Sequence, residues 1–212
     1  MRGFTLIELT ISLLIISLVL GGGALALSGK NYHQREREMK TQLLTIKEAL
    51  YGYAITYGRL PCPALESENS GQENCVSNFG IIPYATLGIS GVDLWGKSIR
   101  YYVHPAFSAT PHEDALSSFT LATGTNKDDT VRKTLPDIYE SKNGKKIVVG
   151  AVAVLWSTGA NGENVENADE AENAAQTLQF IHRPSDKHFD DIVDWISPFV
   201  LKSKMLNAQR LP

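Results

Sequence analysis

The sequence has few cysteines and no excess of positive charge, and both shortages exclude classes of protein. Cys62 and Cys75 are the only cysteines in 212 residues, and no further Cys or His stands at a metal-ligand interval from them, so a zinc site is not expected. A formal net charge of -3 gives no basic surplus for holding a phosphate backbone, so no nucleic acid partner is expected. Internal repeats and low-complexity tracts are also absent.

Motifs of nucleophilic and phosphate chemistry are missing as well. The chain has no Gly-x-Ser-x-Gly elbow, no cysteine beside a usable histidine and no Walker pattern. His33, His104 and His112 stand singly, as structural histidines usually do. We therefore expect a protein that is not an enzyme and that needs no cofactor, with calcium as the one cation to consider.

Charge is absent over one long stretch, from Leu9 to Gly29. These 21 residues would form a helix of about 30 Å, the thickness of one bilayer core. Glu8 stands at the edge of the stretch, where a carboxylate costs up to a few kcal/mol if it enters the bilayer. We predict one membrane-spanning segment and expect Glu8 to have a charged partner.

The residues that lead into this stretch, Gly3-Phe4-Thr5-Leu6-Ile7-Glu8-Leu9, resemble the processing and assembly signal of type IV pilins and pseudopilins. The resemblance implies that prepilin peptidase cleaves between Gly3 and Phe4, so that residues 1–3 are the leader and Phe4 becomes an N-methylated terminus. Glu8 would then compensate the new amine, within one chain or between neighbouring subunits. Residues 4–29 would form the transmembrane and assembly helix, and residues 30–212 the exported globular domain.

Two other interpretations of the same segment remain open. An ordinary secretory signal would use Arg2 as its basic start and would be cleaved after Ala24-Leu25-Ala26. A plain signal anchor would stay uncleaved. Neither interpretation gives Glu8 a purpose.

Two observations bear on the orientation of the segment and disagree. Arg2 precedes it, whereas four basic residues follow it, so a count of positive charge alone would leave the C-terminus in the cytoplasm. Acidic residues are interleaved with the basic ones, and the cysteine pair suits an oxidising compartment. We therefore expect a single-pass inner-membrane protein with its C-terminal domain in the periplasm.

The pattern after the membrane segment predicts a helix followed by a sheet. Apolar residues recur three or four positions apart and form one stripe, which should pack on a sheet: Leu43, Ile46, Leu50, Ala54 and Tyr57. Pro61 and Pro63 end the pattern, so we expect one helix from about residue 4 to about residue 57. Strands are predicted at residues 98–103, 119–123, 147–157, 177–182 and 191–196. Because helical crossovers between most of them are too short, we predict an antiparallel sheet and an α+β, pilin-like fold.

Two predicted turns extend the resemblance into the globular domain. Asp93-Leu94-Trp95-Gly96, before a predicted strand, resembles the Asp-x-Trp-Gly turn of many pseudopilins. The segment Ser157-Thr158-Gly159-Ala160-Asn161-Gly162 resembles the Ser-x-Gly-x-Asn-Gly turn that follows a central strand in those proteins. Many folds use such turn chemistry, so these matches are less specific than the N-terminal one.

The two cysteines leave two possibilities. In an exported domain, Cys62 and Cys75 would form a disulfide that closes a loop of about 14 residues and stabilises the fold by up to about 3 kcal/mol. In a reducing compartment they would be two free thiols.

Acidic residues gather in the C-terminal half, in runs without a fixed ligand spacing. Some pseudopilins bind calcium through a C-terminal acidic loop, and oxygen ligands suit this cation. The candidate ligands are Glu163, Glu166, Asp169, Asp190 and Asp191. The alternative is a solvated loop with carboxylates at strand ends.

The resemblance implies a structural function. We expect a minor pilin or pseudopilin of a type IV pilus, a type II secretion pseudopilus or a related filament, located first in the inner membrane and then in a periplasmic or cell-surface filament. Its partners would be other pilin or pseudopilin subunits, prepilin peptidase, the inner-membrane assembly machinery and membrane lipid. The alternative is a membrane-anchored periplasmic binding or sensing domain that does not polymerise.

Overall fold

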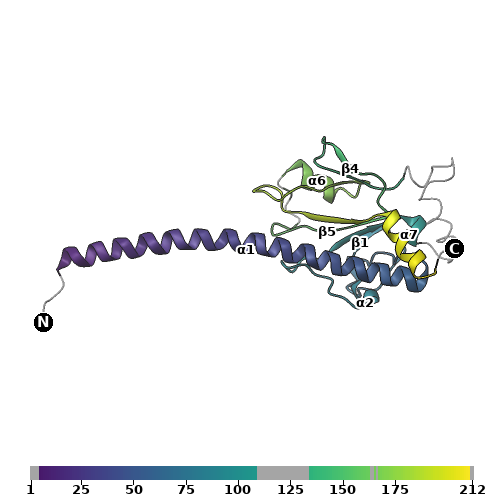
Figure 1. The fold of residues 1–212 in the computed structure, drawn as a ribbon, viewed down its shortest axis with the longest axis horizontal. Coiled ribbons are helices and arrows are strands. Elements are labelled where there is room, and N and C mark those ends of the chain that lie inside the picture. Colours follow the sequence, from purple (N-terminus) through teal and green to yellow (C-terminus); the bar gives the residue numbers. More distant parts are fainter. Residues whose placement is uncertain (1–4, 109–133, 163–164, 166, 211–212) are drawn as a thin grey trace. The chain divides into compact units, whose positions relative to one another are not determined.

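The computed structural model describes residues 5–108, 134–162, 165 and 167–210, without the side chains of residues 19–33. The predicted strand at residues 119–123 lies outside the described residues. The chain divides into two compact units, residues 1–38 and 39–212, and each is considered by itself (Figure 1).

Helix α1, Leu6–Tyr57, contributes to both units. In the second unit its predicted apolar stripe packs into the core, where Leu43, Ile46, Leu50 and Ala54 are at most 2% exposed. Tyr57 was predicted to belong to this stripe but is 48% exposed. It is the last residue of α1, one turn after the buried Ala54, and its ring lies against that of Tyr53 with the two centroids 4.4 Å apart.

A four-stranded sheet forms the centre of the second unit. Its strands, in the order β1-β2-β5-β7, are antiparallel throughout. Their bounds are Phe79–Ile81, Arg100–Val103, Ala153–Ser157 and Ile192–Ile196. The predicted strands at residues 98–103 and 191–196 are therefore confirmed, and so is the α+β fold class.

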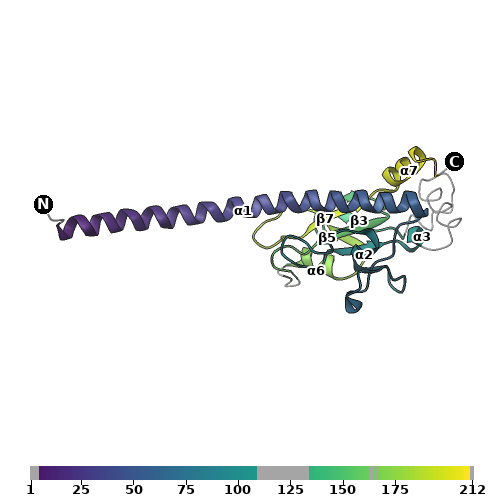
Figure 2. The same ribbon diagram turned by 90° about the horizontal axis from the view of Figure 1, so that it is seen from below.

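Alternation along each strand gives this sheet two apolar faces. On β5, Ala153 and Leu155 point into the core that contains the later part of α1, whereas Val154 and Trp156 point into a second core. Figure 2 shows the part of α1 after residue 38 on one side of the sheet and α6 on the other. The layers are thus helix, sheet and a second sheet.

The second sheet has three strands in the order β4-β3-β6. Their bounds are Lys146–Val148, Asp137–Tyr139 and Gln179–Ile181. Strands β3 and β6 are parallel, so the predicted antiparallel pairing does not extend to this pair, and β3 itself was not predicted. The chain between them passes through β4, β5 and α6, which is a crossover long enough for parallel pairing.

The predicted strand at residues 147–157 is two strands in two different sheets. Gly150, with φ +75°, separates β4 from β5, because this left-handed conformation interrupts a strand. The predicted strand at residues 177–182 contains β6.

Several short helices were not predicted. They are η1 (Glu66–Glu68), α2 (Tyr84–Leu87), α3 (Pro105–Ser108), α6 (Ala168–Ala174) and α7 (Pro198–Asn207). Two of them had sequence signals. Asn167 caps α6 by accepting from the backbone N–H groups of Asp169 and Glu170, and Pro198 opens α7 after Ser197.

Candidate functional site

The start of α1 carries the residues that the N-terminal signal singles out. Gly3 and Phe4 lie outside the described residues. Thr5 accepts the backbone N–H of Glu8 at its side-chain oxygen, 3.4 Å away, and at its carbonyl oxygen, 3.1 Å away. Thr5 and Glu8 thus have the spacing of a helix capping box, and the carboxylate also suits the positive end of the helix dipole. This local role of Glu8 was not predicted from the sequence.

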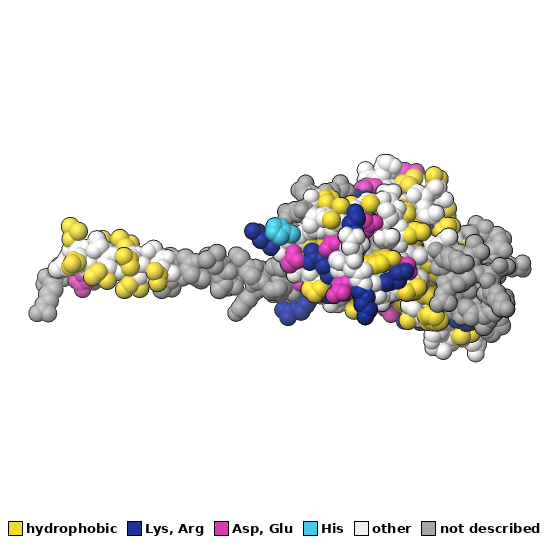
Figure 3. All heavy atoms as spheres, turned by 90° about the horizontal axis from the view of Figure 1, so that it is seen from above, with side chains coloured by type: hydrophobic (Ala, Val, Ile, Leu, Met, Phe, Trp, Pro, Cys, Tyr) yellow, Lys and Arg dark blue, Asp and Glu magenta, His cyan; other side chains and the backbone are white. Residues whose placement is uncertain are grey.

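Residues 5–18 expose apolar side chains on all sides of the helix. The large hydrophobic residues among them are 53% to 83% exposed: Leu6, Ile7, Leu9, Ile11, Leu13, Leu14, Ile15, Ile16 and Leu18. Figure 3 shows the hydrophobic surface of this segment with a single acidic side chain on it. A helix that is apolar all round requires an apolar environment or other helices around it.

No helix is long and apolar enough to cross a membrane over the residues whose side chains the structure describes. Part of the predicted span, residues 19–29, lies outside those side chains.

The hydroxyl groups of this segment bond to the backbone of their own helix. Thr10 donates to the carbonyl of Ile7 at 2.8 Å, and Ser17 donates to that of Leu14 at 2.9 Å. Ser12 donates to the carbonyl of Glu8 at 2.8 Å. These side chains therefore need no outside hydrogen-bond partner, which is what an apolar environment requires.

Cys62 and Cys75 form a disulfide, with their Cα atoms 5.1 Å apart. Between them, Glu73 accepts hydrogen bonds from the two terminal guanidinium nitrogens of Arg59, at 2.8 and 2.7 Å, and from the hydroxyl of Tyr53 at 2.7 Å. Burial opposes ionisation of Glu73, but the hydrogen bonds from Arg59 and Tyr53 prevail and hold the pKa of its carboxyl below the usual value. The disulfide loop is therefore fastened to the end of α1 by a charged network as well.

The two predicted turns of the globular domain meet in space. Asp93 accepts the backbone N–H groups of Trp95 and Lys97, at 2.9 and 2.8 Å, and so closes its own turn. Its other carboxylate oxygen accepts the hydroxyl of Ser157, which is fully buried. The sequence marked both turns but gave no indication that their side chains bond to each other.

The turn after Ser157 is held from the other side by Asp190. Its Oδ2 accepts the backbone N–H groups of Ala160 and Asn161, at 2.7 and 3.0 Å. Gly159 has φ +64°, and a Cβ built there would lie 2.4 Å from Cγ of Asp190. Only glycine allows this approach.

Three buried carboxylates lie close together, and we call them the carboxylate cluster: Glu170, Asp190 and Asp191. One oxygen from each lies within 4.8 Å of the others, and all three side chains are at most 9% exposed. Asp191 accepts from Asn173 at 2.8 Å. Burial, with the charges of Glu170 and Asp190, raises the pKa of Asp191 to about 7.

The predicted calcium ligands are only partly brought together. Asp190 and Asp191 belong to the carboxylate cluster, but Asp169 instead pairs with Arg183 at 2.9 Å. Glu163 and Glu166 lie outside the described residues. Glu170 belongs to the same acidic run but was not among the predicted ligands, and it takes the third place in the carboxylate cluster.

The carboxylate cluster offers an all-oxygen set that suits a hard cation. Asn161 stands beside it, with its amide nitrogen 3.3 Å from Glu170 Oε1, and its side-chain oxygen is buried with no hydrogen-bond donor among the described residues. The only other such group in the described part of the chain is Cys62, Glu73 and Cys75, whose sulfurs are joined in the disulfide.

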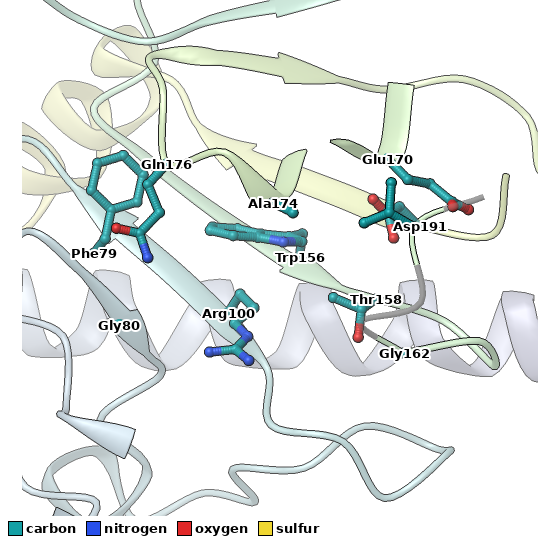
Figure 4. Close-up of a pocket in the computed structure, with 11 residues that line it drawn as sticks. Phe79, Gly80, Arg100, Trp156, Thr158, Gly162, Glu170, Ala174, Gln176 and Asp191 are labelled. Atoms are coloured by element: carbon teal, nitrogen blue, oxygen red, sulfur yellow. The ribbon is translucent and has the colours of Figure 1, made fainter. Parts of the chain in front are cut away.

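A cavity of about 350 Å³ lies next to the carboxylate cluster, and we call it the sheet pocket. Figure 4 shows Trp156 near its middle, Phe79 and Gln176 on one side, and Glu170 with Asp191 on the other. The complete lining is Phe79, Gly80, Arg100, Trp156, Thr158, Gly162, Val165, Glu170, Ala174, Gln176 and Asp191. The pocket therefore combines an aromatic surface with acidic groups at one end.

Comparison with known proteins gives a family match for one part of the chain, its N-terminus. Residues 1–24 match the family described as the prokaryotic N-terminal methylation motif. Neither the curated proteins nor the solved structures compared with the chain include a match. The chain thus carries, at residues 1–24, the N-terminal methylation motif that is the signature of type IV pilins and pseudopilins.

Proposed function

We propose that the chain is a structural subunit, a minor pilin or pseudopilin, of a type IV pilus, a type II secretion pseudopilus or a related filament. Prepilin peptidase cleaves it between Gly3 and Phe4. The first part of α1 then holds it in the inner membrane, with residues 30–212 in the periplasm, until it joins the filament. The proposal assigns no catalytic activity and requires no cofactor.

The observation that carries the proposal is the methylation motif at residues 1–24, joined to a helical segment that is apolar all round. Leaving one large aliphatic side chain in water forfeits about 1.5–3 kcal/mol of burial free energy. Nine such side chains are exposed among residues 5–18, so the segment favours lipid or the helices of other subunits over water. A filament built around such helices would bury them.

Glu8 has two explanations, and they predict different mutant behaviour. As part of a capping box it would stabilise only the first turn of α1. As the partner of the amine of a processed Phe4 it would contribute to subunit docking in a medium of low dielectric constant. The second explanation belongs to the filament proposal.

The first experiment identifies the mature N-terminus. The chain, co-produced with a prepilin peptidase, should begin at Phe4 with one methyl group when analysed by mass spectrometry. A Gly3→Val variant is the control, since a bulky residue at the cleavage site should leave residues 1–3 in place. A terminus at Leu27 would support the secretory-signal interpretation, and an uncleaved wild-type chain would support the plain anchor.

The second experiment tests assembly. Glu8→Gln keeps the size and hydrogen-bonding capacity of the side chain but removes its charge. We expect normal membrane insertion and cleavage, with a loss of co-fractionation with sheared filaments, because a partly buried pair would be broken at a cost of a few kcal/mol. Glu48→Gln is the matched control, since Glu48 is an exposed acid on the same helix in the second unit.

The alternative function is an anchored binding or sensing domain that does not polymerise. It predicts that the wild-type chain never co-fractionates with filaments and that Glu8→Gln behaves like wild type. The sheet pocket supports this alternative, because a binding domain needs a cavity for its ligand, whereas a subunit that only packs against its neighbours does not.

A further inference from the structure

We propose that the sheet pocket binds a lysine or arginine side chain of a partner protein. The pocket lies wholly within residues 39–212, so this inference does not depend on the filament function. Its volume of about 350 Å³ is at the lower end of the range of ligand pockets, which suits one long side chain and its flanking backbone.

The acidic end of the pocket provides the reason for a cationic group. Glu170 and Asp191 line it and are 4% and 6% exposed. Carboxylates brought together out of water lose hydration and repel one another, so a cation placed between them gains more than it would at an exposed site. An ammonium or guanidinium group supplies that charge with several N–H donors.

The wall of the pocket indicates an organic cation with an alkyl chain. Trp156 lies between its two ends in Figure 4, and Phe79 and Ala174 also line it. An indole face attracts ammonium and guanidinium groups, and the methylenes of lysine and arginine pack along apolar surface. A bare metal ion would use the carboxylates but would make no use of this wall.

Donors for the backbone around an inserted side chain come from Arg100, below Trp156 in Figure 4, and from Gln176, on the side away from the carboxylates. The guanidinium of Arg100 pairs at 2.7 Å with Glu66, which does not line the pocket, so the positive charge of Arg100 has its own carboxylate partner. Gln176 places its amide near Phe79 in Figure 4 and has φ +53°, an uncommon conformation for a residue other than glycine. These two side chains can donate to carbonyl groups of a partner, while the carboxylates accept from its cationic head.

The test uses the full chain in detergent micelles and three small probes. These are the Nα-acetyl methylamides of lysine, arginine and norleucine, the last having an alkyl chain without charge. We expect the lysine and arginine probes to shift the Trp156 indole N–H resonance saturably, and the norleucine probe to bind at least about tenfold more weakly, a difference of about 1.4 kcal/mol. No saturable shift, or equal binding of the norleucine probe, would overturn the proposal.

Matched variants locate the site. With the titrations run at pH 8, above the pKa of about 7 of Asp191, Asp191→Asn and Glu170→Gln each remove one charge with little change in volume. Each should weaken the lysine probe at least about tenfold. Glu48→Gln, an exposed acid on α1, should leave binding unchanged. Folding of each variant is checked by its spectral dispersion. Because Glu170 lies in α6 and Asp191 lies just before β7, one folded variant suffices.

Unchanged binding in a folded variant would contradict the inference. A titration with calcium chloride completes the test. If calcium binds at the carboxylate cluster and neither cationic probe binds in its absence, the site is a metal site and the proposal is wrong.

Discussion

At the scale of single residues, Gly159 and Gly52 form a matched pair. A Cβ at Gly159 would approach Cγ of Asp190 to 2.4 Å in a left-handed conformation, whereas a Cβ at Gly52, inside α1, would meet nothing within 4 Å. We predict that Gly159→Ala lowers the free energy of unfolding by about 1–3 kcal/mol. Gly52→Ala should raise it by about 0.5–1 kcal/mol, because alanine is the better helix former. Urea denaturation followed by circular dichroism measures both changes, and a neutral Gly159→Ala would show that the turn can shift away from Asp190.

Asp191 makes stability depend on pH. Its pKa is raised from 3.8 to about 7, so the folded state binds this proton more tightly than the unfolded state does. The contribution is fully present below pH 3.8 and is lost as pH rises through 7, and it amounts to at most about 4 kcal/mol. We expect wild type to be less stable at pH 8 than at pH 5, and Asp191→Asn to remove most of that difference. The free energy of unfolding is measured by urea denaturation at several pH values for both proteins. The same dependence on pH in wild type and in Asp191→Asn would contradict this prediction.

The candidate residues show how far residue patterns can be taken. Glu8, Cys62 and Cys75 stood out because a charge in an apolar run and a lone cysteine pair are rare. Glu170 did not, because nothing in an acidic run shows which carboxylate turns inward. The N-cap at Asn167 accepts from the backbone of both residues and does not distinguish them; only the folded structure shows that Glu170 lies next to Asp190 while Asp169 pairs with Arg183.

At the scale of elements, neighbouring leucines on α1 test the amphipathic prediction. Leu43 is 1% exposed in the core and Leu44 is 55% exposed. Leu43→Ala should cost about 2–5 kcal/mol through lost burial and the cavity it leaves. Leu44→Ala should change stability by no more than about 0.5 kcal/mol. Thermal or urea unfolding of the two variants measures the contrast, and similar costs would mean that the stripe does not face the sheet.

Most of the elements that the sequence predicted have enough residues to show a period, although β6, with three residues, was also predicted and α7, with ten, was not. The stripe from Leu43 to Ala54 spans three turns, and β2, β5 and β7 have four or five residues each. Strands β1 and β3 have three residues, too few for an alternation to be visible. The split at Gly150 could not be predicted, since the apolar run continues on both sides of it and only the sheets differ.

At the scale of the whole molecule, the disulfide joins the segment that follows α1 to the loop before β1. On the chain-entropy model its reduction should lower the free energy of unfolding by about 3 kcal/mol. Alkylation without reductant should leave Cys62 and Cys75 unlabelled. A double variant, Cys62→Ser with Cys75→Ser, should unfold at a lower denaturant concentration than the oxidised wild type and at about the same concentration as the reduced wild type. Labelling of both thiols in the exported, folded chain would contradict the prediction. The network of Arg59 and Glu73 should keep the loop attached in the native state.

The two units contribute different kinds of information about function. The methylation motif, confined to residues 1–24, indicates how the chain is processed and in what class of assembly it takes part. The globular unit has no counterpart among the compared proteins, so its contribution must be sought in its own surface, where the sheet pocket is the feature that packing alone does not require.

The hydroxyls of Thr10, Ser12 and Ser17 have a consequence for transfer between environments. Because each bonds to a carbonyl of its own helix, residues 6–18 can pass from lipid to a bundle of helices without exchanging one of these hydrogen bonds. If the chain passes from a membrane into a filament as proposed, these three hydroxyls add no rehydration cost to that transfer. Glu8 is then the only charged side chain among residues 6–18 whose surroundings must change.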